Sequence, residues 1–120
     1  MKNRPFFLRL GYALSGIIAA LRQENSLKTQ AVFAVMAFVA LLVLQPEPIW
    51  WALVIVMMAL VMAAELFNTA LEALCDYVQP EHHATIGYIK DVAAGAVWLL
   101  SVAAAVVGVL MIYSTLPNWQ

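Results

Sequence analysis

The chain has 120 residues, of which 65% are hydrophobic and 11% charged, whereas soluble domains carry about 25% charged residues. Together with a mean hydropathy of +0.89, this composition indicates one domain of an integral membrane protein. The formal net charge of −1 gives no reason to expect a nucleic-acid partner, and the single cysteine, Cys75, excludes an internal disulfide and a cysteine-built metal site.

The segment 5–24 is predicted to form an amphipathic helix. Its apolar residues recur at intervals of three and four, which places them on one face: Phe7, Leu10, Leu14, Ile17 and Leu21. Polar and basic residues interrupt the pattern elsewhere. Such a helix is better suited to lie in the membrane interface than to span the bilayer. Packing against a partner protein remains open as the alternative.

Three further segments, 27–44, 49–78 and 91–114, are predicted to be transmembrane helices. The second has about 30 residues, or roughly 45 Å at 1.5 Å per residue, so its last turns should leave the hydrocarbon core. Pro46 and Pro48 separate the first two segments. The polar loop 79–91, with Pro80 and Gly87 as helix breakers, separates the last two.

The positions of the basic residues predict the orientation of the chain. Five of the six precede the first span and the sixth precedes the third span: Lys2, Arg4, Arg9, Arg22, Lys28 and Lys90. By the positive-inside rule, the N-terminus and the 79–91 loop lie in the cytoplasm, and the C-terminus lies outside the plasma membrane. We therefore expect any chemistry at the cytoplasmic face.

A polar stripe runs along the end of the second span. At 100° per residue, Glu65, Asn68, Glu72 and Asp76 fall within an arc of about 80°. An ionisable group within a span costs roughly 2.5–3.5 kcal/mol, so such groups need partners. Carboxylate and amide oxygens suit Mg²⁺ that also binds nucleotide phosphates. The alternative, strongest for Asp76, is that these groups lie in water beyond the membrane surface.

Two more charged residues are expected at the same cytoplasmic level. Glu24 follows the amphipathic helix, and Lys90 lies where the third span is predicted to begin. A lysine beside a helix N-terminus is well placed to bind phosphate. Taken alone, Lys90 is a positive-inside anchor and Glu24 a solvated residue. Their joint placement around the polar stripe favours a metal–nucleotide site.

The sequences "AAELFNTALEALCD" (63–76) and "YIKDVAAGAVW" (88–98) resemble characteristic stretches of the prokaryotic diacylglycerol kinase and undecaprenol kinase family. The resemblance covers nearly the whole chain. It implies an all-α membrane protein with a surface helix and three transmembrane helices. It also implies a homotrimer whose active sites are shared between subunits, and ATP-dependent phosphorylation of a lipid alcohol.

The resemblance also implies roles for particular residues. Glu65 would be the general base, and Glu24 and Glu72 would hold Mg²⁺. Asn68 would support the acceptor region. The residues that match positions at the nucleotide are Tyr12, Glu81, His83, Lys90 and Asp91.

The acceptor expected from the sequence is diacylglycerol, with phosphatidic acid as product. Undecaprenol is the alternative, because "KDVAAGAV" and the pattern formed by Glu24, Leu27, Lys28 and Gln30 are closer to the Gram-positive branch. Gln30 stands where the better-studied diacylglycerol kinases carry an acid, which leaves the role of that position open. A small oligomeric cation channel and a structural assembly subunit are alternatives from other functional classes.

Overall fold

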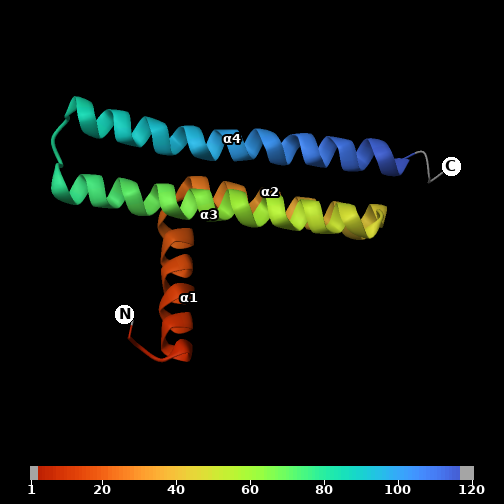
Figure 1. The fold of residues 1–120 in the computed structure, drawn as a ribbon, viewed down its shortest axis with the longest axis horizontal. Helices are drawn as coiled ribbons and strands as arrows, with labels where there is room; N and C mark the ends of the chain where they lie inside the picture. The colour runs from red at the N-terminus through yellow and green to blue at the C-terminus, as the bar shows by residue number, and fades with distance from the viewer. Residues whose placement is uncertain (1–2, 117–120) are drawn as a thin grey trace.

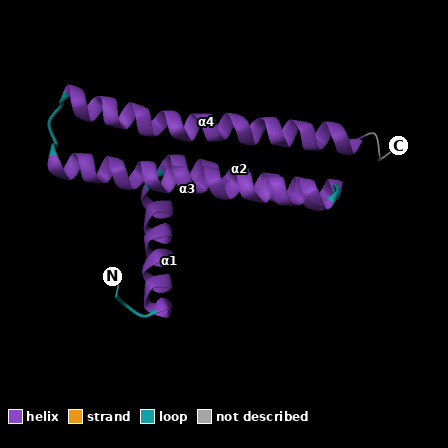
Figure 2. Cartoon of the chain, in the orientation of Figure 1, coloured by secondary structure: helices purple, strands orange, loops and turns teal. Residues whose placement is uncertain are grey.

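The computed structural model describes residues 3–116, which form four α-helices and no strand (Figure 2). The helices are α1 (Phe6–Gln23), α2 (Asn25–Leu44), α3 (Pro48–Val78) and α4 (Ala84–Thr115). The last three are long and apolar enough to cross a membrane. The predicted all-α architecture with three candidate membrane spans is therefore confirmed. Lys2 lies outside the described residues.

The three candidate spans run side by side, and α1 projects away from them, crosswise to their length, from the start of α2 (Figure 1). The most extensive packing joins α3 to α4, with α2 packed on α3. The hairpin of α3 and α4 continues well past the junction of α1 with α2 (Figure 1). One end of the bundle thus consists of α3, α4 and their connecting loop alone.

The helix α1 has no buried residue, and its apolar side chains, such as Phe7 at 83% exposure, are uncovered within this chain. An uncovered apolar stripe fits burial in a membrane interface or against another subunit. The interfacial position of α1 remains a prediction.

The turn between α2 and α3 follows from its residues. Gln45 ends α2 in the left-handed conformation, with φ 48°, and its N–H donates to the Leu41 carbonyl at 2.9 Å. Its side-chain Nε2 donates to the Leu42 carbonyl at 2.9 Å. Pro48 then opens α3, where the missing N–H of proline costs no helical hydrogen bond.

The start of α4 differs from the prediction. The helix begins at Ala84 rather than near residue 91, and Gly87 lies inside it. His83 caps this helix because its Nδ1 accepts a hydrogen bond from the Thr85 N–H at 3.1 Å. One glycine within a helix costs only about 1 kcal/mol, which a cap and a long apolar continuation can offset. Lys90 therefore does not lie at a helix N-terminus, contrary to expectation.

Few side chains are buried within the single chain. The main buried cluster, Leu41, Val54 and Met111, lies toward the end of the bundle near the α2–α3 turn. In the most apolar 18-residue stretch of each candidate span, no more than 17% of the residues are buried. Much apolar surface is thus left for lipid or for other subunits, as expected of a membrane helix bundle.

Candidate functional site

The polar stripe of α3 faces α4. Near the end of the hairpin, the Lys90 Nζ of α4 lies 2.7 Å from the Asp76 Oδ1 of α3. The side chains of Lys90 and Asp76 are 35% and 63% exposed. Asp76, for which a solvated position was the main alternative, thus has a cationic partner. This ion pair marks which residues of the two antiparallel helices lie opposite each other.

Glu65 is one of the few buried polar residues, with 5% exposure. Ser26 Oγ, near the start of α2, donates a hydrogen bond to Glu65 Oε2 at 3.3 Å. This contact places Glu65 at the level of the α1–α2 junction. If α1 lies in the membrane interface as predicted, Glu65 lies at the depth of lipid headgroups and glycerol backbones.

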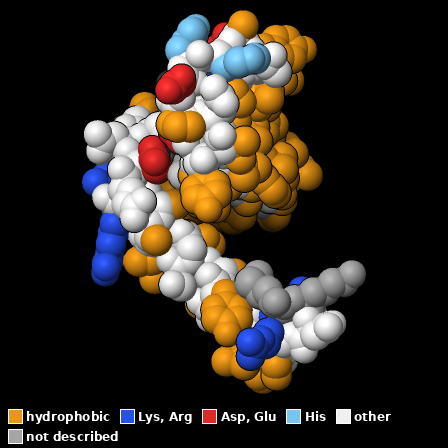
Figure 3. Space-filling model, turned by 90° about the vertical axis from the view of Figure 1, so that its left-hand side faces the viewer, with side chains coloured by type: hydrophobic (Ala, Val, Ile, Leu, Met, Phe, Trp, Pro, Cys, Tyr) orange, Lys and Arg blue, Asp and Glu red, His pale blue; other side chains and the backbone are white. Residues whose placement is uncertain are grey.

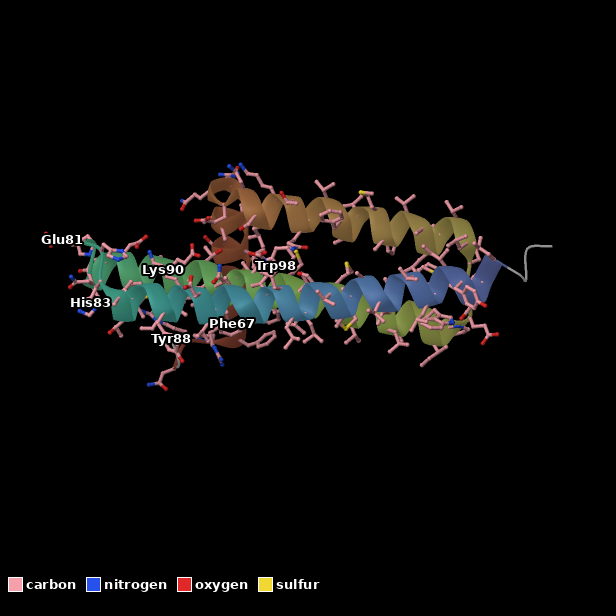
Figure 4. The ribbon with its side chains drawn as sticks, turned by 90° about the horizontal axis from the view of Figure 1, so that it is seen from above. Phe67, Glu81, His83, Tyr88, Lys90 and Trp98 are labelled. Carbon is pink, nitrogen blue, oxygen red and sulfur yellow. The ribbon has the colours of Figure 1, made fainter. Side chains whose placement is uncertain are left out.

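Glu65 lines a cavity of about 510 Å³ between α2, α3 and α4. Four polar residues contribute to its walls: Ser26, Gln30, Glu65 and Ser101. Most of the remaining lining is apolar and includes Phe33, Met58, Val61, Val97 and Trp98. In Figure 4, Trp98 and Lys90 of α4 lie on the side toward α2. Tyr88 of α4 and Phe67 of α3 lie on the opposite side. A carboxylate thus borders an apolar space of the kind a lipid occupies.

Asn68 and Glu72 form the middle of the stripe. Asn68 Nδ2 donates to Glu72 Oε1 at 3.2 Å, which orders the carboxylate. Asn68 Oδ1 is buried without a hydrogen-bond partner in the described part of the chain. Asn68 lines a second cavity, of about 360 Å³, together with Phe67 and Ala93. Glu65 and Asn68 therefore share the stripe but border different cavities.

The residues expected at the nucleotide lie mostly on the projecting part of the hairpin. Figure 4 places Glu81 and His83 at the α3–α4 loop, with Lys90 further along α4. Asp91 is exposed beside Lys90. Figure 3 views this end: acidic and histidine side chains gather there, and basic side chains lie toward α1. Tyr12 is 45% exposed on α1, which runs away from the α3–α4 hairpin (Figure 1).

The proposed metal ligands, Glu24 and Glu72, are both partly buried. Glu24 is the single residue between α1 and α2. Within residues 3–116 no group of three or more His, Cys, Asp or Glu side chains is close enough to hold a metal ion. Mg²⁺ commonly binds one or two carboxylates and completes its shell with phosphate oxygens and water. Glu24 and Glu72 thus remain predicted ligands of a Mg²⁺ that would arrive with the nucleotide.

The structure adds three site residues that sequence reasoning missed: Ser26, Trp98 and Ser101. A signal for Ser26 was present, because Ser26, Gln30 and Phe33 recur at helical spacing on one face of α2. Ser101 could have been found by pairing residues across the hairpin. The misplaced start of α4 concealed that register.

Comparison with known proteins fits these features. The family model of prokaryotic diacylglycerol kinase matches residues 11–112. The chain is 30% identical to the diacylglycerol kinase of Escherichia coli (strain K12), with 87% of this chain and 85% of that protein covered. It is 28% identical to the undecaprenol kinase of Bacillus subtilis (strain 168), with 88% and 86% covered.

The diacylglycerol kinase of Synechocystis sp. is 36% identical over 81% of this chain and 56% of that protein. The match to the family model and the similarity to named kinases favour a kinase over a channel or an assembly subunit. The chain belongs to the prokaryotic diacylglycerol kinase family of membrane lipid kinases.

Proposed function

We propose that the chain transfers the γ-phosphate of Mg-ATP to the hydroxyl of diacylglycerol, giving phosphatidic acid at the cytoplasmic face of the inner membrane. The observation that carries this proposal is the buried Glu65 carboxylate, which borders an apolar cavity of about 510 Å³ at the level of the α1–α2 junction. A lipid can place its hydroxyl at this carboxylate and keep its chains against the apolar walls.

Glu65 acts on the acceptor as the general base. Its carboxylate takes the hydroxyl proton while the hydroxyl oxygen attacks the γ-phosphorus and ADP leaves. Ser26 donates to Glu65 Oε2, which holds the carboxylate in one orientation and leaves Oε1 for the substrate. Because the cavity is largely apolar, it limits the access of water that would otherwise compete as acceptor.

Lys90 contributes positive charge at the nucleotide. An ammonium group has three donors, so Lys90 can keep Asp76 and still donate to a phosphate oxygen. Asp76 then orients the lysine rather than blocking it. His83 Nδ1 accepts from the α4 backbone, which leaves the proton of a neutral imidazole on Nε2 as a donor. Tyr12, Glu81 and Asp91 complete the proposed nucleotide contacts.

Glu24 and Glu72 are the proposed Mg²⁺ ligands, and the Asn68 hydrogen bond presents Glu72 in a defined orientation. When bound, Mg²⁺ neutralises charge on the phosphates, which phosphoryl transfer requires. Asn68 supports the acceptor region from the neighbouring turn of α3.

Undecaprenol is the second candidate acceptor. The identities of the chain to a diacylglycerol kinase and to an undecaprenol kinase, 30% and 28%, do not separate the two. The amide of Gln30 at the cavity wall is compatible with either hydroxyl.

The proposed orientation places the N-terminus in the cytoplasm and the C-terminus in the periplasm. Arg22, Lys28 and Lys90 lie toward the end of the bundle that carries the α3–α4 loop, and the Gln45–Pro48 turn at the other end has no basic residue. We further propose a homotrimer with shared sites. A neighbouring subunit could cover the bare face of α1 and bring Tyr12 to a nucleotide.

The test is phosphorylation by purified protein in vesicles that contain either diacylglycerol or undecaprenol at equal mole fraction. The proposal expects Mg-ATP-dependent product only when ATP is on the side that bears the N-terminus, with the higher kcat/KM for diacylglycerol. A tenfold preference for undecaprenol would overturn the proposed acceptor but leave the proposed kinase activity intact. Product formed only with ATP on the opposite side would refute the orientation.

A further inference from the structure

The side chain of Ser101 carries a buried hydroxyl group that no contact within the fold explains. Its Oγ has no hydrogen-bond partner in the described part of the chain and is shielded from solvent. Buried hydroxyl groups in helices usually donate to the carbonyl four residues earlier. The buried Thr115 does so, to the Met111 carbonyl at 2.7 Å, and the exposed Thr29 does so too, to the Asn25 carbonyl at 3.0 Å. Ser101 departs from this pattern. The residue lines the cavity of Glu65, and rotation about its Cα–Cβ bond can turn the shielded Oγ toward that cavity.

The register of the hairpin places Ser101 level with Glu65. Asp76 and Lys90 face each other at 2.7 Å. Glu65 lies 11 residues before Asp76, and Ser101 lies 11 residues after Lys90, so both are about 16 Å further along antiparallel helices. Glu65 and Ser101 thus border the same cavity, from α3 and α4, at the same depth. In the proposed reaction, the Glu65 carboxylate accepts a proton, and the Ser101 hydroxyl can donate a hydrogen bond.

From this juxtaposition we infer that Ser101 is a specificity-determining residue, which donates a hydrogen bond to an ester carbonyl of the acceptor lipid. This inference rests on the proposed function. In a diacylglycerol the ester carbonyls lie only a few bonds from the free hydroxyl. A hydroxyl at Glu65 therefore keeps a carbonyl within the same cavity. A polyprenol has no carbonyl, and its binding leaves Ser101 without a partner.

The physical basis of the preference is the cost of an unmade hydrogen bond. A hydroxyl buried beside apolar groups is unfavourable unless it finds an acceptor. A glycerolipid supplies that acceptor at the interface depth where its ester groups reside, and its chains continue past Val61 and Phe33. Ser101 thus favours glycerolipid over polyprenol at a wall of the cavity away from the reacting atoms.

The experiment compares two acceptors that differ only in the carbonyls: an ester-linked diacylglycerol and an ether-linked dialkylglycerol of equal chain length. Full-length protein in vesicles should show a higher kcat/KM for the ester, by about threefold to tenfold, the range of one neutral hydrogen bond. Ser101→Ala should lower the value for the ester by that factor and leave the ether within about twofold. Ser101→Thr keeps the hydroxyl and should keep the preference.

Ser114→Ala is the matched control, because it makes the same substitution in α4 near the other end of the helix. This variant should leave kcat/KM unchanged for both acceptors. Equal losses for the two lipids in Ser101→Ala, or no ester preference in the unaltered protein, would overturn the role of Ser101. If the unaltered protein phosphorylates neither glycerolipid, the proposed function fails. If it phosphorylates both equally, only the inference about Ser101 fails.

Discussion

Replacing Glu65 by glutamine tests the catalytic assignment most directly. The two side chains have nearly the same shape, and the amide oxygen can still accept the hydrogen bond that Ser26 makes at 3.3 Å. The cavity and the helix contacts should therefore persist. What is lost is a group able to take the proton of the acceptor hydroxyl.

The expected magnitude follows from the burial of Glu65. A general base contributes typically 10²- to 10⁴-fold to the rate. Glu65 is only 5% exposed, and the walls around it are largely apolar, so bulk water is poorly placed to act as a substitute base. We therefore expect kcat to fall by about 10²-fold or more, at or above the lower bound for such a base. Nucleotide affinity should change little, because the nucleotide residues lie further along the hairpin.

The assay measures initial rates of lipid phosphorylation with saturating Mg-ATP, together with equilibrium binding of a non-hydrolysable ATP analogue. Ser26→Ala serves as control: it removes one hydrogen bond to Glu65 and leaves the base, so it should cost no more than about tenfold. A Glu65→Gln enzyme whose turnover stays within about threefold of the parent would refute the role of Glu65 as the general base.

Three further predictions concern the metal, the ion pair and the α2–α3 turn. Glu24→Ala and Glu72→Ala should each raise the Mg²⁺ concentration needed for activity and the KM for ATP together; an unchanged Mg²⁺ titration would remove that residue from the ligand set. Asp76→Asn should raise the KM for ATP by releasing Lys90, yet leave the free energy of unfolding nearly unchanged, because the pair is exposed; an unchanged KM for ATP would contradict the role of Asp76 in orienting Lys90. Gln45→Gly should raise that free energy by about 0.5–1 kcal/mol in the same detergent, since glycine adopts φ 48° without a strain of about 1–2 kcal/mol, and this gain outweighs the loss of the exposed hydrogen bond from Gln45 Nε2 to the Leu42 carbonyl; a lower melting temperature would contradict this.

The fold was predictable because its dominant signals are long apolar runs. The prolines around Glu47 and at Pro80 end these runs, and the observed helices α2 and α3 begin and end within two residues of the predicted spans. The exception was the start of α4. A glycine in a polar stretch predicts a helix break, whereas the His83 cap and the downstream apolar helix stabilise a continuous helix through Gly87.

The site was predictable only where chemistry recurs along one helix. Spacing on α3 predicted the stripe of Glu65, Asn68, Glu72 and Asp76. Lys90, which was expected at the same level, contacts Asp76. Spacing could not reveal what α2 and α4 add, because contacts between helices depend on register. Ser26 and Ser101 are small, uncharged residues within apolar runs, and only the register gives them a role.

The register also relates the two halves of the proposed reaction. Asp76, Glu72, Asn68 and Glu65 follow one another at intervals of three or four residues, so each lies about 5–6 Å from the next along one face of α3. Lys90 pairs with the outermost, and the apolar cavity of about 510 Å³ opens at the innermost. In the proposed reaction, a nucleotide near Lys90 and a lipid hydroxyl near Glu65 would approach each other along this face. The stripe would then join an aqueous nucleotide to a lipid that need not leave the bilayer.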